Sequence, residues 1–207
     1  MIEIISGSSF SELNKSINHL DTNSPFLDIN FFIALEKSKS IGENTGWIPF
    51  PIVAKNNNEI VGFMPIFLKE HSYGEYVFDH SWADAFQQHG LNYYPKMISA
   101  IPFTPITGNR VLANDVEVKK SMIKALEKIL VEYKISSCHI LFPNQKDHEL
   151  FNEMGWLSRK GVQFKWNNNS YETFDEFLQT LSHNKRKKIK QERKKIEKNG
   201  IIIERKQ

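Results

Sequence analysis

Residues 52–69 read IVAKNNNEIVGFMPIFLK, two apolar runs separated by a cluster of asparagines. Asparagine tolerates the positive φ of tight turns, so the pattern predicts a β-hairpin with strands at 52–55 and 60–69. Toward the N-terminus, IEII at 2–5 predicts a short strand, and further along the chain SSCHILF at 136–142 predicts a buried one. The chain is therefore expected to be built around a sheet.

Helical patterns alternate with these strands. Within residues 114–133, the apolar side chains of Met122, Ile123 and Leu126 share one helical face. Ser or Thr followed three residues later by Glu marks two further helix starts, because this pair satisfies free amides of the first turn. The alternation predicts a mixed α/β class. The expected helices run over residues 9–20, 28–38, 114–133, 145–154, 173–181 and 184–198, and further strands over 156–166 and 201–205.

The positive charge of the chain is concentrated at its C-terminal end. Residues 183–207 hold 11 Lys/Arg against 3 Asp/Glu, whereas the preceding part holds 16 against 21. Such a basic segment attracts phosphate-rich partners by Coulomb steering. A lysine-rich helix is also a common solvated surface, so both interpretations stay open.

The composition excludes several classes of protein. Of the 207 residues, 40% are hydrophobic and 25% charged, which is ordinary for a globular chain and excludes disorder and collagen. The longest apolar-leaning stretches, such as residues 60–68, are far shorter than the roughly 20 residues of a membrane span. A single cysteine, Cys138, forbids an internal disulfide, and the first residues lack the features of an export signal. We therefore expect a cytoplasmic protein.

Residues 70–110 differ from the rest of the chain. They are rich in aromatic and polar side chains and show neither a helical nor a strand period. Loops held over a sheet carry binding groups at irregular spacings, so we expect the functional site here. The prolines of YYPK at 93–96 and PFTP at 102–105 predict rigid, extended segments, which either present side chains to a ligand or only shape a surface loop.

Three strings of the sequence resemble one family. They are GWIPFPIVAKNNNEIVGFMPIFLKEHSYGEYVFDHSWADAF (46–86), YYPKMISAIPFTPITGNR (93–110) and YETFDEFLQTLSHNKRKKIKQERKKIEKNGI (171–201). Together they are similar to the FemAB-like group of predicted N-acyltransferases, often labelled peptidoglycan biosynthesis or recognition proteins, over nearly the whole chain. The run HILFPNQKDHELFNEMGWLSRKGVQF (139–164) also resembles the C-terminal half of the GNAT acyltransferase fold, where a helix packs beside a splayed pair of strands.

The resemblance implies a GNAT-like α/β (α+β) fold with a mixed, twisted sheet flanked by helices. It also implies two tandem domains of this kind. Residues 1–170 would form the N-terminal GNAT-like domain, and 171–207 the capped helix, basic helix and first strand of the second. In Fem-type aminoacyltransferases, a basic helix followed by Gly and a strand opens the second domain. We therefore expect the sequence to be part of a longer protein and inactive on its own.

The resemblance leaves the donor open. Ordinary GNAT enzymes hold the pyrophosphate of CoA on the backbone amides of a Gln/Arg-x-x-Gly-x-Gly/Ala loop, which this chain lacks. Acyl-CoA and aminoacyl-tRNA are both possible donors, and Arg186, Lys190 and Arg193 on one stripe of the basic helix are expected to meet the donor phosphates. Where such proteins commonly read Gln-Phe-His-Trp, residues 163–166 read Gln-Phe-Lys-Trp, so no histidine role carries over.

Acyl transfer to an amine needs a base for the ammonium proton, donors for the tetrahedral oxyanion and an acid for the leaving group. Glu75, Asp79 and His71 are the expected proton carriers. On an extended segment Glu75 shares a face with Tyr73 and points into a cleft lined by tyrosines. The lost hydration would raise the pKa of Glu75 toward that of a useful base.

The expected acceptor is a small-molecule or peptide-like amine. Lys96 and Arg110 either meet an anionic or carbonyl group of this acceptor or form a structural ion pair with Glu75. The residues expected to bind the acceptor are Tyr73, Tyr76, Trp82, Asp84, Tyr94, Lys96, Thr104 and Arg110.

Other kinds of site are disfavoured by the residue pattern. His71 and His80 lack the helical spacing, the cysteines and the acidic neighbours of a metal site, so we expect no metal. Cys138 lies in an apolar strand and is expected to be a small core residue, with His139 structural on the other face. A hydrolase is disfavoured because the chain shows no nucleophile elbow with a Ser-His-Asp order.

The sequence therefore predicts an N-acyltransferase or aminoacyltransferase of the FemAB-like GNAT type. The alternative is a non-catalytic module that recognises an acceptor, such as a cell-wall precursor, and supports a second catalytic domain. A nucleic-acid-associated protein that uses the basic helix alone is the weakest alternative, because no aromatic residues are interleaved with the basic run.

Overall fold

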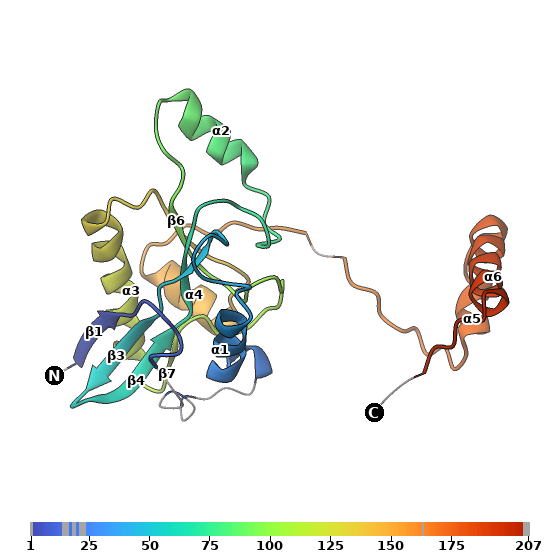
Figure 1. Cartoon of the computed structure of the whole chain (residues 1–207), viewed down its shortest axis with the longest axis horizontal. Coiled ribbons are helices and arrows are strands. Elements are labelled where there is room, and N and C mark those ends of the chain that lie inside the picture. The colour runs from blue at the N-terminus through green and yellow to red at the C-terminus, as the bar shows by residue number, and fades with distance from the viewer. Residues whose placement is uncertain (1, 14–16, 18–19, 21–23, 163, 205–207) are drawn as a thin grey trace. The chain divides into compact units, whose positions relative to one another are not determined.

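The computed structural model describes residues 2–13, 17, 20, 24–162 and 164–204. The chain divides into two compact units, unit 1 up to Arg159 and unit 2 from Lys160. Within the described residues, unit 1 carries the strands and α1 to α4, and unit 2 carries α5 and α6 (Figure 1). The helices are η2 (Pro25–Leu27), α1 (Ile29–Lys37), α2 (His80–Gln88), α3 (Val116–Glu132), α4 (Gln145–Glu153), α5 (Phe174–Gln179) and α6 (His183–Lys198).

Unit 1 contains two four-stranded sheets. The first, in the order β1-β3-β4-β7, is antiparallel. The second, in the order β2-β5-β6-β8, is mixed, because β6 and β8 run parallel. The expected mixed α/β class is thus confirmed. The strands are β1 (Ile2–Ser6), β2 (Trp47–Pro49), β3 (Ile52–Asn56), β4 (Glu59–Met64), β5 (Ile66–Lys69), β6 (Lys96–Ser99), β7 (Leu112–Ala113) and β8 (Cys138–Ile140).

The asparagine turn joins β3 to β4 as expected. Asn57 and Asn58 have φ values of 48° and 70°, the left-handed conformation that asparagine tolerates. The apolar run after the turn is two strands rather than the expected one, because Pro65 has no amide hydrogen to donate and follows the end of β4. Since β4 belongs to the first sheet and β5 to the second, this run carries the chain from one sheet to the other.

Alternate residues of the strands face two separate hydrophobic cores. In β3, Val53 packs with Phe32 of α1 in one core, whereas Ile52 and Ala54 pack with Met122 of α3 in the other. The alternation follows from the strand period of two, which sends successive side chains to opposite faces. Helices therefore cover both faces of the first sheet, and Figure 1 shows α1 and α3 on its opposite sides.

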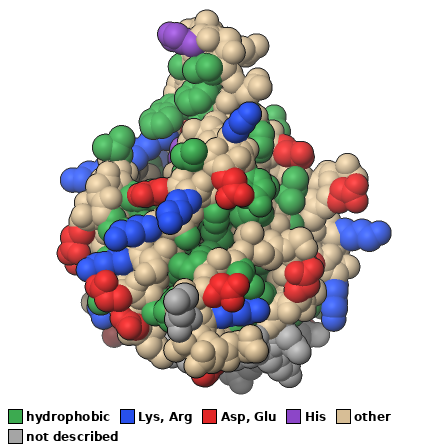
Figure 2. Space-filling view, turned by 90° about the vertical axis from the view of Figure 1, so that its left-hand side faces the viewer, with side chains coloured by type: hydrophobic (Ala, Val, Ile, Leu, Met, Phe, Trp, Pro, Cys, Tyr) green, Lys and Arg blue, Asp and Glu red, His purple; other side chains and the backbone are tan. Residues whose placement is uncertain are grey.

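The segment expected to be irregular, 70–110, contains two regular elements. One is α2, which projects from unit 1 with none of its residues buried (Figure 1). Hydrophobic side chains gather on this projection at the top of Figure 2. The other is β6, whose four residues are all buried, so that no polar and apolar alternation marks it in the sequence. This correction moves Lys96 from a loop into a strand.

Two expected strands are missing from the described part of the chain. Residues 156–162, 164–166 and 201–204 form no strand there, and apart from the partly buried Trp156 their large apolar side chains are exposed, as at Val162 (87%). The capped helix expected at 9–20 lies partly outside the described residues, and residues 11–13 form a turn.

The other expected helices are confirmed. Asp115 caps α3 by accepting from the amide of Glu117, and Thr173 caps α5 by accepting from the amide of Glu176. Gly155 follows α4 with a φ of 86°, a conformation that glycine adopts without strain. In the part of the chain that the structure describes, no helix combines the length and apolarity needed to cross a membrane.

Candidate functional site

A cross-strand row of side chains organises the candidate site. In the second sheet, Trp47 of β2 lies opposite Lys69 of β5, and Lys69 lies opposite Lys96 of β6. Ile98 pairs with His139, which places this β8 side chain on the same face of the sheet. Both lysines are fully buried. Like charges directly opposite each other are destabilising, so the row requires nearby carboxylates.

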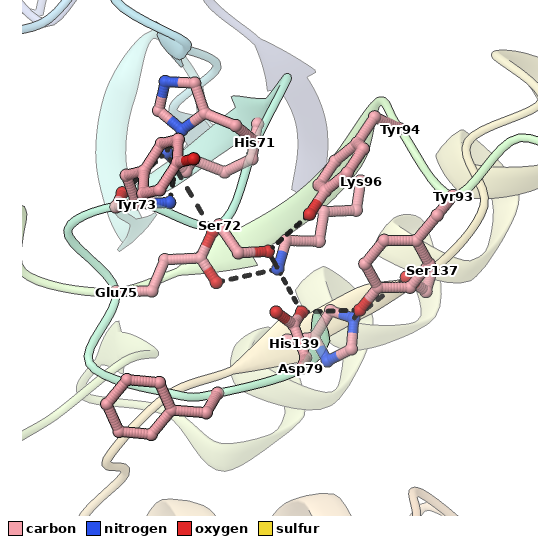
Figure 3. Close-up of polar contacts among 12 residues, drawn as sticks. His71, Ser72, Tyr73, Glu75, Asp79, Tyr93, Tyr94, Lys96, Ser137 and His139 are labelled. Carbon is pink, nitrogen blue, oxygen red and sulfur yellow. Dashed lines mark hydrogen bonds and ion pairs between the residues drawn. The ribbon is translucent and has the colours of Figure 1, made fainter. Parts of the chain in front are cut away.

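Two carboxylates hold Lys96 (Figure 3). Its Nζ donates to Glu75 Oε2 at 2.7 Å and to Asp79 Oδ2 at 2.5 Å. It also donates to Ser72 Oγ at 2.8 Å, and Ser72 Oγ lies 2.8 Å from the Tyr94 hydroxyl. Glu75 and Asp79 are 3% and 2% exposed, so the whole ion-paired group is removed from water. Charges buried in this way persist only when they are paired and hydrogen bonded.

The carboxylates are supplied by the loop at residues 70–79, whose path depends on glycine. Gly74 has a φ of +78°, and a Cβ at this position would lie 2.8 Å from the ring of Phe103. At the preceding residue of the loop, the carbonyl of Tyr73 accepts a hydrogen bond from Trp47 Nε1 at 3.1 Å. The loop is therefore pressed against the face of the second sheet, which turns the following carboxylate inward.

Asp79 stands at the N-cap of α2 but makes no cap hydrogen bond. Its Oδ2 accepts from Lys96 and, at 2.6 Å, from the hydroxyl of Tyr93. This hydroxyl lies 3.4 Å from His139 Nε2, which is 2.9 Å from Ser137 Oγ. A chain of polar contacts thus runs from the buried lysine to the start of β8 (Figure 3).

Lys69 has a different environment from Lys96. Its Nζ lies 3.9 Å from the centre of the Trp47 ring and donates to the carbonyl of Tyr73 at 3.3 Å. It also lies 3.5 Å from His71 Nδ1. Glu75 Oε1 is 4.0 Å away, which is an ion-pair distance but too long for a hydrogen bond.

Burial and pairing shift the pKa values of the cluster in different directions. Burial raises the pKa of Glu75, opposed by the hydrogen bond and charge of Lys96. Burial acts upward on Asp79 too, but hydrogen bonds from Lys96 and Tyr93 outweigh it and lower the pKa to about 2. Burial lowers the pKa of Lys69 to about 7, although the charge of Glu75 opposes it. At neutral pH Asp79 is ionised, whereas Glu75 and Lys69 are shifted toward neutrality.

The residues of β8 beside the cluster are uncharged at neutral pH. Burial, followed by the charge of Lys96, lowers the pKa of His139 to about 4, so its imidazole is neutral. Burial raises the pKa of the Cys138 thiol to about 12, which keeps it protonated and unreactive. Burial and the hydrogen bond to Asp79 raise the pKa of Tyr93, which therefore remains a phenol.

The structure brings four of the expected site residues into one cluster, namely Glu75, Asp79, Lys96 and, through Ser72, Tyr94. The ion pair between Glu75 and Lys96, one of the alternatives left open by the sequence, is present. His71 lies at the edge of this group, where its Nε2 is 3.1 Å from the carbonyl of Thr45 and its Nδ1 accepts from a backbone amide.

The side chains expected to surround the base lie mostly at the surface. Two tyrosines that precede β6 join the cluster, Tyr94, which was expected, and Tyr93, which was not. They contact each other edge to face, with ring centres 5.0 Å apart. The expected residues that are exposed are Tyr73, Tyr76, Trp82 and Asp84.

Arg110 lies outside the cluster and is bonded to backbone oxygens. Its Nε donates to the carbonyl of Leu141 at 2.8 Å, and Nη2 to that of Ile106 at 2.6 Å. Its own amide donates to Asp147 Oδ2, which also ties α4 to this region. Thr104 is likewise satisfied locally, because its Oγ1 donates to a carbonyl two residues earlier. In this structure neither side chain is directed at the lysine cluster.

The three residues expected to meet donor phosphates contact other parts of unit 2. Arg193 lies over the ring of Phe174 at 4.5 Å, and Lys190 Nζ is 3.5 Å from Asp175 Oδ1 in α5. Arg186 Nη2 donates to the backbone carbonyl five residues earlier. Arg193 and Lys190 therefore pack against α5 and Arg186 against the turn that follows it, and the remaining lysines of α6 are exposed.

Lys69, Tyr93 and His139 were missed by sequence reasoning. A signal for Lys69 was available, because it ends the apolar run at 66–69 in a strand where a charged residue is unusual. Tyr93 and His139 carried no such signal, since their approach depends on the parallel pairing of β6 and β8.

The cluster has the components of proton-transfer chemistry. Glu75 Oε1 is buried and lacks a hydrogen-bond partner among the described residues, and burial raises the pKa of this carboxyl. Such an oxygen can accept a proton, and the two fixed lysines can stabilise negative charge in a site of low dielectric constant. The described residues contain no group of three His, Cys, Asp or Glu side chains arranged to hold a metal ion.

A solved acetyltransferase shares the architecture of this chain. The ribosomal-protein-alanine N-acetyltransferase from Brucella melitensis biovar Abortus 2308 matches with a TM-score of 0.50 and 10% identity, over 81% of this chain and 100% of that one. An aminoglycoside N-acetyltransferase, AAC(6')-Iy in complex with CoA, matches with a TM-score of 0.49 and 12% identity, over 81% and 95% of the two chains. At this identity the first likeness shows the fold, which is the GNAT acetyltransferase fold.

Sequence comparison places the chain in a family. No curated protein matches it. The family model of the FemAB-like proteins, described as peptidoglycan biosynthesis/recognition, matches residues 2–207. Because this match spans almost the entire chain, the protein belongs to the FemAB-like family.

Proposed function

We propose that the protein is an N-acyltransferase that transfers an acyl or aminoacyl group to an amine, with the Lys96–Glu75–Asp79 cluster as its reaction centre. Membership of the FemAB-like family supports this reaction class, and the GNAT fold is compatible with it. The observation that carries the proposal is the geometry of Glu75. Its carboxylate is buried and bonded through Oε2 to a fixed lysine, while Oε1 is left for a proton.

Glu75 acts as the base in this reaction. An amine acceptor is an ammonium ion at neutral pH and must lose a proton before its nitrogen can attack. Oε1 accepts that proton while Lys96 fixes Oε2. The nitrogen then bonds to the carbonyl carbon of the donor, and the bond from this carbon to the thioester sulfur or ribose oxygen breaks. The second proton, which the nitrogen loses as the amide forms, passes to the leaving carrier. Asp79 stays ionised and holds Lys96, and His71 holds Lys69.

The acceptor reaches Glu75 through the loop that covers it. Tyr73 and Tyr76 flank this residue and are 72% and 56% exposed, whereas Glu75 itself is 3% exposed. In the proposal, a displacement of this loop opens the Glu75 carboxylate to the acceptor. We expect acceptor binding to cause this displacement, as lid movements do in many enzymes.

The donor in the proposal is acyl-CoA or aminoacyl-tRNA, and the acceptor is a small or peptide-like amine. The description of the family favours an amine of a cell-wall precursor. Residues 171–207 would begin a second GNAT-like domain, on which activity would depend. The assay therefore uses the protein at its full natural length.

The test of the proposed function follows release of the carrier. The protein is incubated with a series of acyl-CoA esters and with charged tRNAs, with and without amine acceptors, and free CoA thiol or deacylated tRNA is measured. We expect one donor class to show release that depends on an acceptor. Release no faster than in buffer, for both donor classes and every acceptor, would contradict the proposal.

A second function is favoured by the completeness of the ion pairs around Lys96. Both Glu75 and Asp79 bind this lysine, an arrangement also found in purely structural clusters. The domain would then recognise the acceptor, and catalysis would belong to another domain. In that case Glu75→Gln would weaken acceptor binding and leave donor turnover intact.

A further inference from the structure

The positive charges of the two buried lysines of the cross-strand row are paired unequally with carboxylates. Lys96 Nζ has Glu75 Oε2 and Asp79 Oδ2 within hydrogen-bond distance. Lys69 is just as buried, yet the carboxylate oxygen that it pairs with, Glu75 Oε1, is 4.0 Å away. The proposed base thus lies between two cations, one bonded to Oε2 and one facing Oε1 without a direct hydrogen bond.

The position of Lys69 is fixed by neutral groups. The backbone amide of Tyr73 donates to His71 Nδ1, which leaves the ring proton on Nε2, where it points to the carbonyl of Thr45 at 3.1 Å. His71 Nδ1 is therefore an acceptor for Lys69 at 3.5 Å, together with the carbonyl of Tyr73 and the face of Trp47. None of these partners carries a negative charge, so the charge of Lys69 acts mainly on the nearby carboxylate.

The free oxygen of Glu75 is the atom on which this charge acts. Glu75 Oε1 is buried and has no hydrogen-bond partner among the described residues. An opposite charge within about 4–6 Å stabilises the ionised form of a carboxyl group. Without the Lys69 ammonium, only Lys96 would oppose the burial that favours the neutral acid.

We infer that Lys69 is a positioning residue that keeps Glu75 Oε1 charged and ready to accept a proton, through an ammonium held 4.0 Å away by Trp47, His71 and the Tyr73 carbonyl. The inference rests on the proposed function only for the use of Oε1 as a base. The coupling of the two side chains is independent of that use.

Other charged groups around the pair are accounted for. Lys96 acts on Glu75 in the same direction as Lys69, and Asp79 acts against both. Burial is the largest cause that raises the pKa of Glu75 and lowers that of Lys69 to about 7. Other titratable groups near the pair include Glu70, His71, Tyr93, Tyr94 and His139.

The experiment titrates Glu75 directly. Protein labelled with ¹³C at the glutamate side-chain carboxyl is followed by NMR against pH, and loss of one resonance in Glu75→Gln assigns it. In Lys69→Met we expect the pKa of Glu75 to rise by about 1–3 units, because a facing positive charge is lost. Lys69→Arg keeps the positive charge, so the pKa of Glu75 in this variant is expected to stay near its wild-type value.

Lys119→Met is the matched control, because Lys119 Nζ also pairs with a buried carboxylate, Asp147 Oδ1 at 3.3 Å, outside this cluster. It should leave the Glu75 titration unchanged. A wild-type titration in Lys69→Met, or the same shift in Lys69→Arg, would overturn the inference.

A reciprocal measurement covers the case in which Lys69→Met does not fold. Protein labelled with ¹³C at lysine Cε reports Lys69, assigned by its loss in Lys69→Arg, and Glu75→Gln should move its pKa below about 7. If the pKa of Lys69 were the same in wild type and in Glu75→Gln, the two side chains would not be coupled. If the Glu75 titration shifts but the pH profile of acyl transfer does not, the base role in the proposed function fails while the coupling stands.

Discussion

Lys96 Nζ lies 2.7 Å from Glu75 Oε2, in a buried ion pair between residues 21 positions apart in the chain. The contact joins β6 to the loop that follows β5, and Asp79 extends it to the start of α2. Because these charges are removed from water, each depends on the others for compensation. The loop, the strand and the helix start are therefore expected to lose their positions together when the shared cation of Lys96 is removed.

Lys96→Met tests this dependence. It leaves Glu75 and Asp79 without their shared cation, and removing one partner of a buried ion pair typically costs about 3–5 kcal/mol. We expect a loss of this size in the free energy of unfolding measured in urea. Lys120→Met, which breaks an exposed pair with Glu117 at 3.1 Å, should cost less than about 1 kcal/mol. Equal effects of the two substitutions would contradict the account.

The buried amine of Lys69 predicts that stability rises with pH above neutrality. Its pKa is about 7 in the folded chain, against about 10.4 for an unfolded lysine. Between these values the unfolded chain binds more protons, so the free energy of unfolding increases with pH. From pH 7 to pH 9 we expect the free energy of unfolding of wild type to rise by about 2 kcal/mol relative to that of Lys69→Met, measured by urea unfolding. If the stability of the two proteins changed in parallel with pH, the pKa of Lys69 would not be lowered by folding.

The lowered pKa of the Asp79 carboxylate predicts a loss of stability at acid pH. Its folded pKa of about 2 is below the unfolded value of about 3.9, so its contribution is complete above the unfolded pKa and is lost as pH falls through 2. Wild type should exceed Asp79→Asn in stability at pH 5, and this gap should shrink by about 2 kcal/mol toward pH 2. A gap that does not change with pH would rule out a lowered pKa.

Gly74→Ala tests the loop that carries Glu75. The substitution strains a residue at φ +78° and places Cβ 2.8 Å from Phe103. Gly90→Ala is the control, because Gly90 has a φ of +68° but nothing within 4 Å, so it should show only the strain of about 1 kcal/mol. We expect Gly74→Ala to be more destabilising by about 1–3 kcal/mol and to be partly rescued by Phe103→Ala. Identical thermal unfolding of Gly74→Ala and Gly90→Ala would exclude the steric explanation.

The elements predicted well from the sequence are those with local signals. The asparagine turn between β3 and β4 needs only the backbone preference of Asn57 and Asn58, and α3 follows from its apolar face and the Asp115 cap. By contrast, β6 is four buried residues that begin with a lysine, and its identity depends on the strands β5 and β8 on either side. Such non-local pairing is not visible in one short segment.

The candidate site follows the same division. Glu75, Asp79 and Lys96 lie in the aromatic and polar segment that the sequence indicates, because irregular spacing of such residues is a local property. The approach of Lys69 to Glu75, and of His139 to Tyr93, is set by strand register, since a shift of one residue would turn the Lys69 and His139 side chains to the other face. The sequence therefore indicated the region and Lys96 as one of two alternative partners of Glu75, whereas Lys69, Tyr93 and His139 required the fold.

The most direct test of the central claim is the rate of acceptor-dependent carrier release by Glu75→Gln. This substitution preserves the size of the side chain and removes the base, so we expect the rate to fall by about 10²–10⁴-fold while the fold persists. Glu117→Gln, at an exposed glutamate of α3, should match wild type. Acceptor-dependent release at the wild-type rate by Glu75→Gln would contradict the claim that this carboxylate accepts the proton of the amine.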